Sequence, residues 1–200
     1  MTVTNSLGMN PGTAGYAIKS NGAGSVATSV DPTTLGTLIP LVTRNASVSA
    51  TLEFNTYIDG TYEVYKLEYS GLYQSIDAAL GIQVSVNGGS TWLGATSNYG
   101  WSRNGFNDSS TLNRGGDNTD TSLEINDYPS TTLATSSGEV WLLDPNAGTF
   151  NVLATALSVD TTHTYAATVV AGSAVDAFRI RPTVGGGTMT AGKFILYGVL

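Results

Sequence analysis

The chain contains no cysteine and only one histidine, His163. Without cysteine there is no disulfide, no thiolate metal site and no cysteine nucleophile, and a chain of 200 residues can bury a stable core without them. With one histidine, metal sites of several histidines are excluded and a Ser-His-Asp triad would need His163. That residue lies in a strand-like segment with no neighbouring Ser-Gly elbow. We therefore expect His163 to be a solvated strand residue.

Charged side chains are scarce as well, at 12% of the chain against about a quarter in typical domains. Fifteen acidic and eight basic residues give a net charge of −7, and the basic residues are scattered, which excludes a nucleic-acid partner. The first residues lack the basic and apolar regions of a signal peptide. No stretch approaches the ~20 apolar residues of a membrane-spanning helix. We expect a soluble protein without a membrane partner.

Short segments of alternating apolar and polar residues fill much of the chain. Leu80, Ile82, Val84 and Val86 share one face of a strand that ends at the turn signal 87–90. One strand is predicted at 46–56 and another at 62–70. The run at 140–143 is apolar on both faces. Further strands are predicted at 149–157, 162–171, 174–182 and 192–199. Regularly spaced short strands with little helix predict an all-β, antiparallel two-sheet sandwich of the jelly-roll kind over 46–200.

Residues 1–45 show no sustained periodicity and contain three prolines. We predict an extended N-terminal arm that lies against a neighbouring subunit. Four apolar side chains would anchor it, namely Tyr16, Ile18, Leu38 and Ile39. Because such an arm adds contacts without enlarging the domain, removing residues 1–42 is expected to leave the sandwich folded. A partly disordered leader is the alternative.

The segment 94–132 is too polar and too long for an ordinary loop. Aromatic rings beside amide, guanidinium and carboxylate groups suit a sugar, because the rings pack on its CH-rich face and the polar groups bind its hydroxyls. The candidate glycan-binding residues are Tyr99, Trp101, Arg103, Asn104, Phe106 and Asp108. Two alternatives remain. Trp101 and Phe106 could simply anchor the loop, or a hairpin at 98–106 and a strand at 122–125 could shorten it.

No catalytic or metal-binding constellation stands out. Five acids lie at strand positions, namely Glu53, Glu63, Glu68, Glu124 and Glu139. Four of the five have an apolar or aromatic neighbour in alternation, which predicts that they face outward. A calcium site at 117–120 fails the EF-hand spacing, although an irregular site that includes Asp127 stays open. We predict no enzymatic activity, no metal and no cofactor.

Several strand and turn sequences resemble one family. A strand ending in Phe54, the turn Asp59-Gly60-Thr61-Tyr62, the sequence VNGGSTW at 86–92 and the closing strand KFILYGVL at 193–200 are similar to small structural proteins of tailed bacteriophages. The similarity spans roughly residues 45–200. It implies a non-enzymatic virion protein, made in the host cytoplasm, that decorates the capsid or belongs to the tail or fibre apparatus.

The same resemblance implies the partners. The chain would assemble with itself, with a homotrimer favoured, and with other virion proteins of the capsid or tail. The alternative function is the receptor-recognition tip of a tail fibre, in which the six residues of the 94–132 segment bind a host surface glycan during host attachment.

Overall fold

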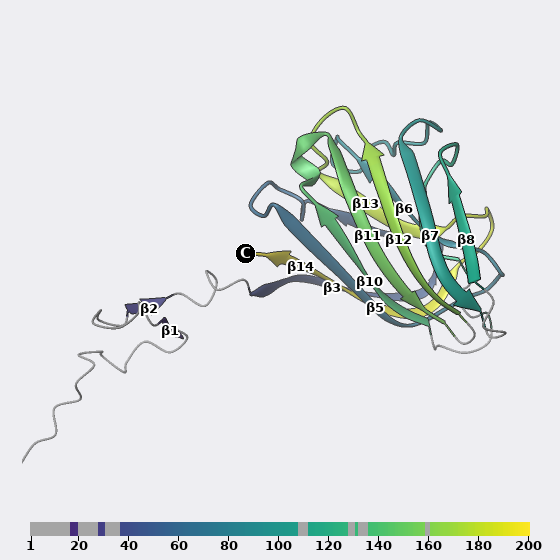
Figure 1. Ribbon diagram of the computed structural model, residues 1–200, viewed down its shortest axis with the longest axis horizontal. Helices are drawn as coiled ribbons and strands as arrows, with labels where there is room; N and C mark the ends of the chain where they lie inside the picture. Colours follow the sequence, from purple (N-terminus) through teal and green to yellow (C-terminus); the bar gives the residue numbers. More distant parts are fainter. Residues whose placement is uncertain are drawn as a thin grey trace, which may run out of the picture.

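Alternation of apolar and polar residues along the chain produces two antiparallel sheets that pack face to face as a β-sandwich (Figure 1). The computed structural model describes residues 17–19, 28–30, 37–107, 112–127, 131, 136–158 and 161–200. The larger sheet has eight strands in the order β3 (Leu38–Ser49), β14 (Met189–Val199), β5 (Val64–Gln74), β10 (Ser136–Leu143), β11 (Thr149–Leu157), β12 (Thr161–Val170), β7 (Tyr99–Asn107) and β8 (Leu112–Asp117).

The smaller sheet has four strands in the order β4 (Leu52–Asn55), β13 (Ala177–Pro182), β6 (Leu80–Ser85) and β9 (Leu123–Asn126). In Figure 1 its strands β13 and β6 lie behind β11, β12 and β7. Outside both sheets, β1 (Ala17–Lys19) pairs with β2 (Thr28–Val30), and a 3₁₀ turn spans Pro145–Ala147. Within the described ranges, no helix has the length and apolar character needed to cross a membrane.

The core lies between the two sheets. At its centre the rings of Phe54 and Phe178, on the neighbouring strands β4 and β13, stack with centroids 4.6 Å apart, and both side chains are fully buried. Tyr65, Leu67 and Phe194, on the inner face of the larger sheet, belong to the same buried core. The predicted all-β sandwich is therefore confirmed.

The strand predicted at 46–56 is divided between the two sheets. β3 ends at Ser49 and pairs with β14, whereas β4 begins at Leu52 and pairs with β13. Near the end of β3, Val48 has a positive φ of 53° and an exposed side chain. The prediction of one strand was wrong because the apolar alternation continues through the point where the chain changes sheet, so periodicity alone does not show the break.

The sheet also begins earlier than the boundary at residue 46. Leu38 and Ile39 pair with Val199 and Gly198 of β14, so residues 38–45 are part of the eight-stranded sheet. Figure 1 shows the start of β3 beside the C-terminus. Deleting residues 1–42 would remove part of β3, and a deletion must end before Leu38 to keep the strand intact. Tyr16 and the side chain of Ile18 lie outside the described residues.

The segment 94–132 contains strands rather than one long loop. β7 and β8 form a hairpin of the larger sheet, and β9 belongs to the smaller sheet. The structure therefore contains the strand expected near residues 122–125, but the hairpin expected at 98–106 is longer: residues 99–107 form one strand, and its partner is β8.

Candidate functional site

The face of the eight-stranded sheet that points away from the core is open to solvent, and we call it the outer face. Along β11 and β12 every second side chain is exposed, and the side chains between them are buried against the smaller sheet. Of the eight large apolar side chains that are exposed in the described residues, five lie on this face, namely Phe106, Leu112, Leu153, Leu157 and Val170. This distribution makes the outer face the candidate contact surface of the described residues.

Cross-strand pairing arranges the outer face in rows that run across the strands. The row that contains Trp141 and Leu153, here called the central row, consists of Pro40, Tyr197, Lys66, Trp141, Leu153, Ala166, Ser102 and Gly116. The adjacent row, here called the second row, consists of Leu38, Val199, Val64, Leu143, Asn151, Thr168 and Gly100. None of the residues in these two rows is acidic, although the chain has a net charge of −7.

Lys66 supplies the one positive charge of the central row, and its neighbours neutralise it. Its Nζ atom lies 2.7 Å from Glu68 Oε1, 2.8 Å from Glu139 Oε2 and 4.9 Å from the centroid of the Trp141 ring. The Tyr197 hydroxyl donates a 3.2 Å hydrogen bond to Glu68 Oε2. Burial opposes the charged form of Lys66, but the hydrogen bonds with Glu139 and Glu68 outweigh burial and raise its pKa. The cluster is therefore fixed in one geometry.

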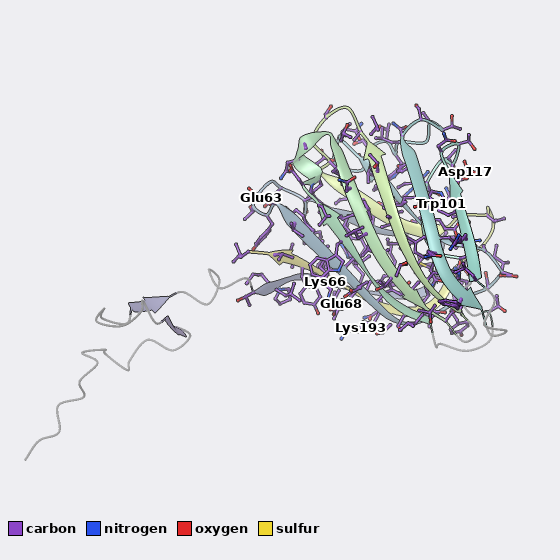
Figure 2. All side chains as sticks on the ribbon, in the orientation of Figure 1. Glu63, Lys66, Glu68, Trp101, Asp117 and Lys193 are labelled. Carbon is purple, nitrogen blue, oxygen red and sulfur yellow. The ribbon has the colours of Figure 1, made fainter. Side chains whose placement is uncertain are left out.

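Two shallow hollows mark the outer face. One of about 800 Å³ lies over strands β10 to β8, where small residues leave space; its lining includes Gly100, Ser102, Gly116, Asn151, Leu153 and Thr168. The other, of about 430 Å³, crosses β14 to β12 and is lined by Glu68, Glu139 and Lys193 together with several hydroxyl side chains. Figure 2 shows Lys66, Glu68 and Lys193 on the side of β5 and β14, apart from Trp101 and Asp117 on β7 and β8. The ion cluster of the outer face thus lies on the side of β5 and β10, whereas the larger hollow over β11, β12 and β7 is lined mainly by small and neutral side chains.

Behind the outer face, Arg103 joins the two sheets through a largely buried ion cluster. Its Nη1 atom lies 2.8 Å from Glu124 Oε1 on β9 and also contacts Asp127 Oδ2. The hydroxyl of Tyr165 accepts a hydrogen bond from the backbone N–H of Asp127 at 2.7 Å. These contacts fasten β9, an edge strand of the smaller sheet, to β7 and β12 of the larger one.

The environment of Glu124 favours its protonated form. Burial, followed by the hydrogen bond and charge of Asp127, raises the pKa of Glu124 to about 8, although Arg103 acts in the opposite direction. With Glu124 neutral, the charges of Arg103 and Asp127 balance inside the sandwich. A proton held between Glu124 and Asp127 thus belongs to the folded structure at neutral pH.

Stability should therefore fall as the pH rises towards 8. In the unfolded state Glu124 loses its proton near pH 4.5, the ordinary pKa of a glutamate, whereas in the folded state it keeps the proton up to about pH 8. The stabilisation from this proton is therefore complete below pH 4.5 and is lost as the pH rises to about 8. His163, whose pKa burial lowers from 6.5, does not titrate in the upper part of this range. We expect the free energy of unfolding, measured with urea, to decrease as the pH rises from about 5 to about 8 and to level off above pH 8.

Glu124→Gln is the matched control, since the amide accepts from Arg103 and donates to Asp127 as the protonated acid does. The variant should show a flatter pH profile and should be more stable than the unchanged protein at the alkaline end. An unchanged slope in Glu124→Gln would show that another group is responsible.

The structure does not bring the six predicted glycan-binding residues onto one surface. Tyr99, Trp101 and Arg103 point to the inner face of β7, where Tyr99 is buried and Trp101 Nε1 donates a 2.8 Å hydrogen bond to Asp120 Oδ2. Asn104 and Phe106 point to the outer face. Asp108 lies outside the described residues. Alternation along a strand separates neighbouring residues onto opposite faces, and the loop interpretation did not take this into account.

Two further expectations about polar residues are corrected. His163 is buried on the inner face of β12, where it packs beside Gly105, and is not a solvated residue. Glu124 faces Arg103 rather than solvent. The acids considered for calcium have separate partners, because Asp117 accepts from Thr119, Asp120 from Trp101 and Asp127 from Arg103. Among the residues that the structure describes, no group of three or more His, Cys, Asp or Glu side chains could hold a metal ion.

Sequence reasoning did not identify the central row, because its members come from strands that are distant in the chain. One signal was present. The run at 140–143 is apolar on both faces, a pattern of strands that are covered on both sides. In the described structure the inner side of β10 is buried through Val140 and Leu142, whereas Trp141 and Leu143 stay partly exposed. The second side of this strand thus lacks the cover that its sequence indicates.

Comparison with known proteins gave no similar protein: no family model, no curated protein and no solved structure matches the chain.

Proposed function

We propose that the protein is a non-enzymatic structural component of a tailed-bacteriophage particle, a capsid decoration or a tail or fibre accessory, and that it assembles with itself and with other virion proteins. The observation that supports this most directly is the outer face, where exposed apolar side chains gather and the two neighbouring rows contain no acid. A chain with a net charge of −7 repels its own copies over most of its surface. Contact centred on these two acid-free rows reduces that repulsion.

The resemblance of the strand and turn sequences to phage structural proteins supports the particle context. The polar clusters of the described residues support a structural rather than a catalytic role, because each is engaged in holding strands together. Lys66 bridges two carboxylates on adjacent strands, and Arg103 bridges the two sheets. A general acid or base works with a perturbed pKa in a cleft, whereas in the part of the chain that the structure describes the carboxyl group with a pKa raised to about 8 is Glu124, which is packed between the sheets.

The proposal predicts that the full chain forms a stable oligomer at micromolar concentration. Sedimentation velocity and light scattering would measure its mass. Because the contact is apolar rather than ionic, the oligomer should persist at about 1 M salt, where the Debye length falls to about 3 Å and surface ion pairs are screened. A monomer at all accessible concentrations, with no incorporation into particles, would contradict the proposal.

A further inference from the structure

We propose that the outer face is an interface between two copies of this chain, related by a twofold axis, with Trp141 and Leu153 at its centre. This inference rests on the proposed self-assembly and names the surface that performs it. A twofold contact requires a patch that is complementary to itself, so that each copy supplies both halves of every contact.

The position of Trp141 and Leu153 supports this assignment. They lie on β10 and β11, the fourth and fifth of the eight strands, and they pair directly across these strands. Leu153 is 46% exposed. Trp and Tyr near the centre of an interface contribute most of its binding energy, and polar side chains around them exclude water. The Thr, Ser and Asn side chains on the outer side of β11, β12 and β7 form such a border.

The charges on the face are compatible with a second copy. The one ammonium group of the central row, Lys66, is already paired with Glu68 and Glu139, so the cluster needs no counter-ion from the partner. Lys66 is already paired and only 9% exposed, so covering it desolvates no free ammonium group. Elsewhere in the central and second rows the contact involves neutral groups only.

The size of the face is sufficient for a stable pair. Eight strands about 4.8 Å apart span roughly 34 Å, and nine residues at about 3.3 Å each span roughly 30 Å. Their product is about 1,000 Å² per copy, above the about 800 Å² that each partner buries in a standard interface. Two such faces would stack as the sheets of a sandwich do, and β10 would gain the second cover that its apolar sequence indicates.

A saccharide fits this centre less well. Sugar rings pack on an open aromatic face, but Lys66 Nζ lies over the ring of Trp141, and the neighbouring side chains are the aliphatic Leu143 and Leu153. Aliphatic side chains next to an aromatic ring match the core of a protein interface.

The test compares Leu153→Asp with Val184→Asp in the full chain. Both residues are large, apolar and exposed, at 46% and 56%, but Val184 lies in the loop after β13, away from the outer face. In a twofold pair Leu153→Asp places a carboxylate from each copy near the axis, and we expect it to weaken dimerisation about 100-fold or more. Val184→Asp should leave the dimer unchanged. Circular dichroism and the melting temperature of the monomer verify that both variants are folded.

The outcomes separate this inference from the proposed function. A dimer that Leu153→Asp dissociates supports both. An oligomer, a trimer for example, that withstands Leu153→Asp overturns the interface but leaves self-assembly in place. A monomeric unchanged protein overturns both. Titration with cellohexaose and maltohexaose tests the remaining case. If the protein does not dimerise but binds either sugar, and Leu153→Asp abolishes this binding, the outer face is a site for a neutral saccharide. That result overturns the inference.

Discussion

Arg103→Ala should destabilise the protein by about 3–5 kcal/mol, because breaking a buried ion pair from one side leaves an uncompensated charge in the interior. Arg103 lies between Glu124 and Asp127, and the side chains of all three are 12–14% exposed. Without the guanidinium group the two carboxyl groups face each other, and β9 loses its link to β7. Thermal unfolding followed by circular dichroism should show a melting temperature lower by about 6–20 °C.

The matched control is Arg44→Ala. Arg44 lies on the edge strand β3 with its side chain exposed, so we expect a change within about 0.5 kcal/mol. If Arg103→Ala and Arg44→Ala unfold at the same temperature, the cluster does not hold the sheets together. Arg103→Lys is informative as well, because both carboxyl groups contact the single nitrogen Nη1, and an ammonium group keeps the positive charge but lacks the shape and reach of the guanidinium group. It should recover only part of the loss.

Phe178→Ala should cost about 3–5 kcal/mol, since it leaves a cavity in a core that cannot fully collapse. The ring is completely buried on β13, and it stacks on Phe54 with an angle of 8° between the ring planes. The substitution removes both the transfer energy of the ring and the stacking contact. Urea unfolding would measure the difference in free energy.

Phe106→Ala serves as the comparison for the same change of side chain. Phe106 is 57% exposed on the outer side of β7, so the folded monomer should lose less than about 0.5 kcal/mol. Equal losses for the two phenylalanines would contradict the assignment of the inner and outer faces. A loss confined to association, with an unchanged monomer, would be consistent with the outer face acting as the contact surface.

The two results together would separate the requirements of folding from those of assembly. The Arg103 cluster and the Phe54–Phe178 stack stabilise the sandwich from within, whereas the central row contributes little to the monomer because its second side faces water. Variants of the central row should therefore fold and fail to associate. Variants of the core should fail at both, since the outer face is flat only when the sheet beneath it is intact.

The sequence alone determined the class of fold and excluded several functions. Period-two alternation is a local property, so it predicted the strands at 80–87, 149–157 and 162–171, which the structure forms within a few residues. The lack of cysteine excluded thiol chemistry, and the lack of clustered basic residues predicted that nucleic acid is not a partner; neither argument depends on the fold. The turn signal at 87–90 likewise depended only on residues that tolerate a positive φ, as Gly88 and Gly89 show.

The tertiary structure decided which side of each strand faces the core and which residues meet across strands. Alternation identifies two faces but does not say what covers them; the cover of Trp141, Arg103 and His163 depends on strands far away in the chain. The order β14, β5, β10 brings Tyr197, Lys66 and Trp141 side by side, although 131 positions separate the first two in sequence. Glu124 meets Arg103 only because the two sheets stack. These contacts depend on which distant strands pair, and the local strand propensity of a segment does not determine its pairing partner.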